Sequence, residues 1–191
     1  MGTTLLEVCN RALSRIGVAR IGALTEATAG ARAMSACFPG VPDWVLRIWR
    51  WSFAIKRVPL LNPQDASETG YAWRYELPAD YLNWAGDSLG EPHRGVLSVV
   101  EGGSLLSDKG APFELRYVSR VVDAGEWDPA FAEVVAWKIA LEVQPELAPG
   151  AVVATLLSEF HESLRDAHWG GAIEMVPSMR TAGDDWLISR I

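Results

Sequence analysis

Apolar residues recur at helical spacing through the first fifty residues. Thr4 and Glu7 have the spacing of a capping box, and Gly17 supplies a stop after the apolar stripe that follows them. Thr28 opens a second helical stretch, which the proline-containing segment 38–42 interrupts before a third stretch begins. Helices are therefore predicted over residues 4–16, 28–37 and 42–49.

The period changes to alternation in the middle third of the chain. Pro59 and Pro78 each end an extended segment, and a polar loop occupies residues 62–70. Gly102 and Gly103 separate two apolar runs and can adopt the positive φ angles of a tight hairpin turn. We expect strands at residues 53–58, 71–77, 96–100, 105–106 and 113–118, forming one small antiparallel sheet between helices.

Two more helical stripes complete the pattern. Asp128 followed by Pro129 suits the start of a helix whose apolar residues form one stripe. After residues 145–150, a second stripe runs to Gly170–Gly171, where that helix is expected to end. Helices joined by so short a loop pack antiparallel, with the N-terminal helices as their partners.

These elements predict an α+β fold, an antiparallel helical bundle with an inserted small antiparallel β domain. The 191 residues, 49% hydrophobic and 21% charged, suffice for one core with a small satellite. The bundle is assigned to residues 1–51 and 127–171, the β domain to residues 52–126, and an extended C-terminal docking tail to residues 172–191.

Composition bears on compartment and charge. No apolar run approaches the ~20 residues that a membrane span requires, and the first residues lack the pattern of a secretory signal, so we expect a cytoplasmic protein without membrane contact. Cys9 and Cys37 are expected to pack as small hydrophobic residues. The net charge of -7 argues against general nucleic-acid binding.

The charge is unevenly distributed along the chain. Residues 1–60 carry a net charge of +5 and the remainder carries -12. A molecule with one basic and one acidic end could stack on copies of itself or on a neighbour of opposite polarity. Alternatively, the two signs mix on the folded surface.

Motifs for catalysis, cofactor binding or metal binding are missing from the sequence. It holds neither the phosphate-binding pattern G-x-x-x-x-G-K-[ST] nor the nucleophile elbow G-x-S-x-G. His161 and Glu162 begin like a zinc-protease motif without its second histidine, and His168, seven residues on, brings no third ligand. Both histidines are expected on a solvated helix surface. We therefore expect a protein that is not an enzyme, with no cofactor.

Tryptophan is unusually frequent, with nine in 191 residues. Nine indole rings cannot all fit in a core this small, and Trp and Arg are enriched at protein contacts. Arginine makes up fourteen of the seventeen basic residues, which suits interface ion pairs. The alternative explanation is a GC-rich genome that biases codons toward Arg, Ala and Trp.

Several short motifs follow one another in a characteristic order. They are NRALSRIG (10–17), IGALTE (21–26), VLRIWRWSFA (45–54) with Arg57 and Leu60, YELPADYL (75–82), LRYVSR (115–120) and an alanine-rich helix from Phe131 to Leu147. In this order they resemble the tail tubular protein A family, the head-to-tail adaptors of tailed phages, over about residues 5–170. The departures are Trp49–Arg50, where a His-Pro pair is common, and the unmatched C-terminal tail.

The resemblance implies a structural subunit of a homo-oligomeric ring, a dodecamer in the family. Such a ring is assembled in the bacterial host cytoplasm, docks under the portal protein in the virion neck and presents a surface to the downstream tail or nozzle protein. Genomic DNA passes through its lumen without sequence-specific binding. The alternative, from another class, is a cytosolic small-molecule-binding or regulatory domain with a cleft between bundle and sheet.

Three surfaces are expected to serve such an assembly. Acidic residues beyond residue 60 would line the lumen and let DNA slide, unless they serve solubility alone. The hairpin of Gly102, Gly103, Leu105 and Leu106 would reach a neighbouring subunit or the next tail component, or else pack on its own sheet. The tail would be extended in the free subunit and order on the portal, or else cap its own bundle. Its docking residues are expected to be Trp186, Leu187, Ile188 and Ile191.

Overall fold

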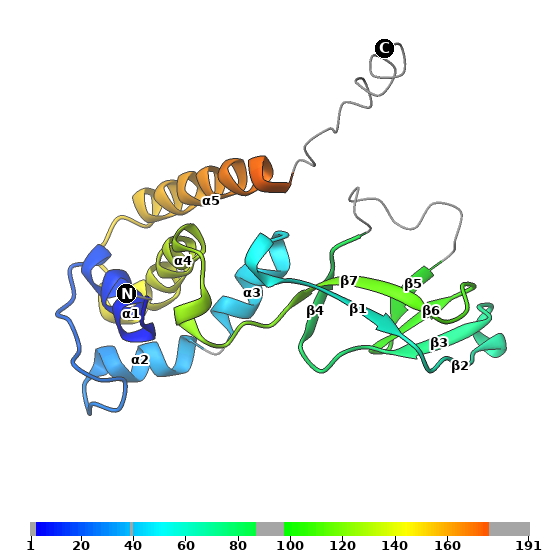
Figure 1. Cartoon of the computed structure of the whole chain (residues 1–191). Helices are drawn as coiled ribbons and strands as arrows, with labels where there is room; N and C mark the ends of the chain where they lie inside the picture. The colour runs from blue at the N-terminus through cyan, green and yellow to red at the C-terminus, as the bar shows by residue number, and fades with distance from the viewer. Residues whose placement is uncertain (1–2, 39, 87–97, 176–191) are drawn as a thin grey trace, which may run out of the picture.

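The computed structural model describes residues 3–38, 40–86 and 98–175, with helices at one end of the molecule and strands at the other (Figure 1). The predicted α+β class is confirmed. The described helices are α1 (Leu5–Arg15), α2 (Ala29–Cys37), α3 (Val41–Ile48), α4 (Pro129–Leu147) and α5 (Val153–Met175). The described strands are β1 (Ile55–Leu60), β2 (Gln64–Asp65), β3 (Trp73–Glu76), β4 (Tyr81–Trp84), β5 (Ser98–Glu101), β6 (Ser104–Ser107) and β7 (Phe113–Ser119).

Helix α4 is the element around which the other helices pack. Helices α1, α2, α3 and α5 all contact it. Its buried residues lie on several sides of the helix rather than in the single predicted stripe, because Ala132, Ala136 and Ala140 are buried together with the larger apolar side chains. A helix that is apolar on several sides needs several neighbours to cover it.

Local side-chain caps begin α1, α2 and α4 as predicted. The Thr4 N–H donates to Glu7 Oε2 at 2.8 Å and the Glu7 N–H donates to Thr4 Oγ1 at 3.3 Å, which completes the capping box of α1. Gly17 follows α1 with a φ of +71°, a left-handed conformation that favours glycine. Thr28 and Asp128 cap α2 and α4, respectively.

Three predicted boundaries are wrong. Pro145 lies within the last turn of α4, where the loss of one backbone hydrogen bond costs less than burial of the helix gains. Helix α5 continues through Gly170 and Gly171 to Met175, and Gly171 packs beside the Trp49 ring. Strand β1 continues through Pro59, which is tolerated because β1 is an edge strand.

The C-terminal tail is only partly within the described structure. Residues 172–175 belong to α5, so the assignment of an extended tail from residue 172 is wrong at its start. The proposed docking residues Trp186, Leu187, Ile188 and Ile191 lie outside the described residues.

The described strands form two antiparallel sheets where the pattern predicts one. Their orders are β1–β7–β4 and β2–β3–β6–β5. Strand β4 falls where no strand is predicted, and β2 falls in the predicted polar loop. Tyr75 of β3 and Phe113 of β7 meet with ring centroids 5.6 Å apart in a small core between the sheets. Alternation marks strands but not their partners, because pairing depends on contacts distant in sequence.

The predicted glycine hairpin is present and its leucines face inward. Gly102 and Gly103 have φ angles of +54° and +76° and join β5 to β6, which confirms the predicted turn. Leu105 is 0% and Leu106 is 4% exposed, so both leucines pack within their own subunit, which was the alternative to a contact with a neighbouring protein. Their side chains are therefore not a free contact surface, although the glycine tip is exposed.

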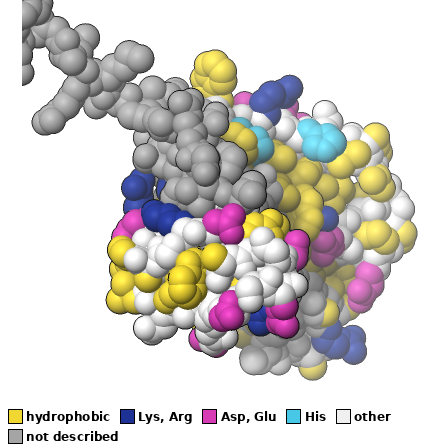
Figure 2. Space-filling view, turned by 90° about the vertical axis from the view of Figure 1, so that its right-hand side faces the viewer, with side chains coloured by type: hydrophobic (Ala, Val, Ile, Leu, Met, Phe, Trp, Pro, Cys, Tyr) yellow, Lys and Arg dark blue, Asp and Glu magenta, His cyan; other side chains and the backbone are white. Residues whose placement is uncertain are grey.

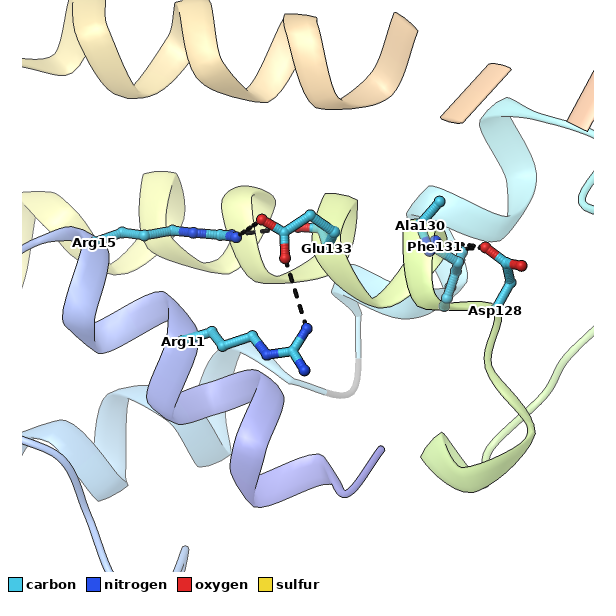
Figure 3. Close-up of polar contacts among 6 residues, drawn as sticks. All are labelled: Arg11, Arg15, Asp128, Ala130, Phe131 and Glu133. Atoms are coloured by element: carbon cyan, nitrogen blue, oxygen red, sulfur yellow. Dashed lines mark hydrogen bonds and ion pairs between the residues drawn. The ribbon is translucent and has the colours of Figure 1, made fainter. Parts of the chain in front are cut away.

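Removing the cap of α4 should weaken the whole fold. Asp128 Oδ1 accepts hydrogen bonds from the N–H groups of Ala130 at 2.8 Å and Phe131 at 3.3 Å (Figure 3). Asp128→Ala should lower the free energy of unfolding by about 0.5–2 kcal/mol, measured by urea denaturation. Asp128→Asn keeps an acceptor oxygen and should remain close to the unmodified chain; equal losses in both variants would contradict this account.

The small core between the sheets can be tested at Leu105. Leu105→Ala leaves a cavity there and should lower the free energy of unfolding by about 2–5 kcal/mol in urea denaturation. Leu61 is the matched control because it is 61% exposed, and Leu61→Ala should change stability by less than about 0.5 kcal/mol. If the Leu105→Ala variant were as stable as the unmodified chain, burial of Leu105 in this core would be contradicted and Leu105 would remain a candidate contact residue.

Candidate protein-binding surface on helix α5

Helix α5 packs on α4 through one stripe of side chains. Leu156, Phe160 and Ala167 are buried along this stripe. Because an α-helix has 3.6 residues per turn, the neighbouring side chains fall on either side of the stripe. One side carries aromatic and aliphatic residues and the other carries carboxylates, and each lines a groove.

The aromatic groove lies between α5 and the residue that follows α3, and has a volume of about 390 Å³. The Trp49 ring stacks on the His168 ring with centroids 3.8 Å apart and an interplanar angle of 20°. Figure 2 shows the two described histidines beside hydrophobic side chains in the upper part of that view. The lining residues are Trp49, His161, Leu164, Arg165, His168 and Trp169.

Large apolar side chains of α3 and α5 are exposed. Trp169 lines the groove and is 76% exposed, and the exposed Leu157 lies one helical turn before His161. The exposed Ile48 directly precedes Trp49, and Trp44, which is 43% exposed, has its ring centroid 6.3 Å from that of Phe160 of α5. We call these four residues, together with the aromatic groove, the aromatic face. Clustered exposed apolar side chains of this kind mark interaction sites more often than isolated ones do.

Two other tryptophans belong to the interior. Trp51 and Trp127 each meet the Phe131 ring edge-on, with centroids 5.0 and 5.1 Å apart, and both are buried. Their indole N–H groups donate to the carbonyls of Val45 at 2.8 Å and Val121 at 3.0 Å, respectively. Tryptophan therefore serves both the core and the surface, as its frequency suggested.

The acidic groove lies on the other side of α5 and has a volume of about 380 Å³. Arg15 lies 3.8 Å from the centre of the Trp137 ring and pairs with Glu133, and Arg11 reaches the same carboxylate at 3.6 Å (Figure 3). Burial lowers the pKa of Arg15 to about 10. The carboxylates that line the groove are Glu133, Glu159, Glu162 and Asp166.

The charge polarity along the chain is thus partly neutralised within the subunit. Arg11 and Arg15 come from the basic segment and Glu133 from the acidic remainder. Lys56 of the basic segment likewise pairs with Asp80 of the acidic remainder, with Nζ and Oδ2 2.6 Å apart. The two signs mix at these places, while the acidic groove keeps an excess of carboxylates.

The described residues offer little for metal or thiol chemistry. No group of three or more His, Cys, Asp and Glu side chains in the described part of the chain is placed to hold a metal ion. His168 is half-buried in its stack, so the expectation that it is solvated is wrong. Cys9 and Cys37 are free thiols, and burial raises their pKa values to about 11 and about 12, so both stay protonated at neutral pH. None of the described helices has the length and apolarity to cross a membrane.

The predicted hairpin does not belong to this surface, and the predicted docking residues of the tail lie outside the described residues. The hairpin of Gly102 and Gly103 lies at the strand end of the molecule, away from α5 (Figure 1). The aromatic face was missed as a site because the stripe from Val152 to Leu164 mixes residues from two sides of α5. The separate series Leu157, His161, Leu164 and His168, spaced by four, three and four residues, is the signal that could have revealed it.

No protein-family model and no curated protein sequence matches the chain.

The half-buried His168 predicts a pH dependence of stability. Burial lowers the pKa of His168 below 6.5, so near and below pH 6.5 the unfolded chain binds a proton more readily than the folded chain. The stability that the neutral His168 contributes should therefore be complete above about pH 6.5, and the free energy of unfolding should decrease as the pH falls through this value. Urea titrations at about pH 7.5 and about pH 5.5 measure the decrease.

Paired variants isolate this contribution from that of the carboxylates. His168→Phe keeps an aromatic ring beside Trp49 without a titrating group and should show a smaller decrease between the two pH values. His161→Phe, at an exposed position on the same helix, should keep the decrease of the unmodified chain. An identical decrease in both variants would contradict the role of His168.

Proposed function

We propose that this chain is a structural head-to-tail adaptor of a tailed bacteriophage, a ring subunit that joins the portal protein to the next tail component. The observation that carries the proposal is the aromatic face, on which Trp44, Trp169, Leu157 and Ile48 are exposed. Buried tryptophans dominate the binding energy of many protein interfaces, and an exposed cluster of them favours an assembling subunit. The ordered motifs from residue 10 to residue 147 favour the same family.

The proposal assigns a role to each surface. The helices form the bundle of the adaptor and the two sheets its inserted β domain. The glycine tip of the hairpin, Gly102 and Gly103, contacts a neighbouring subunit or the downstream tail protein. Residues Trp186, Leu187, Ile188 and Ile191 dock on the portal.

The acidic groove suits the channel through which DNA passes. Glu159, Glu162 and Asp166 have no ion pair within the described residues, although Glu159 interacts electrostatically with Arg15, so the groove keeps an excess of negative charge. A lumen that bound phosphates would hold DNA back through the release of many counterions, whereas like charge lets DNA slide. A basic channel in an assembled ring would contradict this assignment.

A second candidate function rests on a different cavity. A groove of about 450 Å³ lies between the α2–α3 junction and the segment that follows β7. Phe38, Pro42 and Trp127 supply an apolar lining, and Arg120 pairs with Asp43 at its rim with Nη2 and Oδ2 2.6 Å apart. A volume of this size suits a small molecule, as expected for a cytosolic ligand-binding or regulatory domain.

Light scattering coupled to size-exclusion chromatography separates the two functions. The adaptor should form a ring alone or with portal protein, and Trp44→Ala with Trp169→Ala should weaken this assembly by about 30-fold or more, as loss of at least 2 kcal/mol at an interface requires. Trp73→Ala is the matched control, because Trp73 is exposed on β3 at the other end of the molecule and the variant should assemble normally. A chain that stays monomeric with and without portal protein would contradict the adaptor proposal.

A further inference from the structure

We propose that residues 184–191 of this chain dock in the aromatic groove of the same molecule before any assembly takes place. The inference concerns the isolated chain and does not depend on the proposed function. It departs from the expectation of an extended tail, and it rests on the groove, on the distance to be spanned and on charge.

The aromatic groove is open and apolar. The half-buried Leu164 lines it together with the stacked rings of Trp49 and His168 and the exposed ring of Trp169. Within the described residues nothing covers Trp169, which keeps 76% of its surface exposed. A hydrophobic surface of this kind gains stability when an apolar segment covers it.

The chain carries an apolar segment of the required kind a short way beyond α5. Residues 186–188 are Trp-Leu-Ile and residue 191 is Ile. Large apolar side chains gathered so closely in sequence are strongly driven to leave water, and one tryptophan buries roughly 150–250 Å² when it is covered. The groove offers aromatic and aliphatic partners for them.

The distance allows the segment to return to the groove. Arg165 precedes Met175, the last residue of α5, by ten positions, so the two lie roughly 15 Å apart along the helix axis. The ten residues 176–185 can span up to about 33–36 Å when extended. Because the connection is this short, the effective concentration of the segment at its own groove is high, which favours the same molecule over a second copy.

Charge sets the direction in which the segment lies. Asp184 and Asp185 directly precede the apolar run. Arg165 is exposed on the edge of the groove and forms no ion pair with another described residue. Pairing of Asp185 with Arg165 places Trp186 against the Trp49, His168 and Trp169 rings. The opposite side of α5, with Glu159 and Asp166, would repel the same two aspartates.

The docked arrangement has a consequence for assembly. The aromatic face and the segment 184–191 are each apolar surfaces that a partner could bind. When they cover one another, neither is free, so the isolated chain is protected from premature association. A partner that binds either of them must then compete with the intramolecular contact.

Disulfide trapping in the full-length chain tests the docking. Leu164→Cys combined with Asp184→Cys keeps Arg165 and Asp185 and should form an intramolecular disulfide under mild oxidation, seen as a monomer on a non-reducing gel with a mass loss of two hydrogens. The matched control combines Ser163→Cys with Asp184→Cys, which places the thiol in the acidic groove. The first pair should react about tenfold faster than the second, because docking raises the local thiol concentration only at the aromatic groove.

A further variant shows whether the apolar side chains drive the contact. Adding Trp186→Ala, Leu187→Ala and Ile188→Ala to the first pair should reduce its rate to that of the control pair. Equal rates in the two pairs, a rate that the three alanines leave unchanged, or a disulfide that forms only between two molecules would each overturn the proposal.

Discussion

Burial of helix α4 is the constraint on which the other helices depend. The Phe131 ring in its first turn lies edge-on to Trp51 and Trp127, and these two tryptophans connect it to α3 and to the segment that follows β7. Since α4 is apolar on several sides, it gains stability only when several neighbours cover it together. The N- and C-terminal parts of the chain must therefore come together around it.

The position of α5 follows from this requirement. It covers the remaining side of α4 with Leu156, Phe160 and Ala167, and its other side chains then fall on two flanks of opposite chemistry. Its Gly170–Gly171 turn remains helical, and Gly171 lies near the Trp49 indole N–H. Helix α5 thus contributes to an apolar surface together with Trp49 and to an acidic surface together with Glu133 of α4.

Electrostatics links the two ends of the chain. Glu133 of α4 receives both Arg11 and Arg15 of α1, and the Arg15 guanidinium is also stacked on Trp137. These ion pairs neutralise, within the subunit, part of the net positive charge of the first sixty residues. The carboxylates of α5 that form no such ion pair within the described residues then give the groove beside them an excess of negative charge.

The sequence alone predicted the elements whose causes are local. The capping box of Thr4 and Glu7, the Asp128 cap and the turn at Gly102–Gly103 each depend on residues within four positions of one another, and all are present. The α+β class follows because helical and alternating periods are also local properties.

Tertiary structure decided what depends on contacts between distant segments. The division into two sheets, the continuation of α4 through Pro145 and of α5 through Gly170–Gly171, and the inward position of Leu105 all come from such contacts. The candidate surface depends on them as well, because Trp49 and His168 lie far apart in the sequence and stack only after α3 and α5 have packed beside α4. The free energy of those contacts arises from burial between segments, and no local pattern encodes which segments will meet.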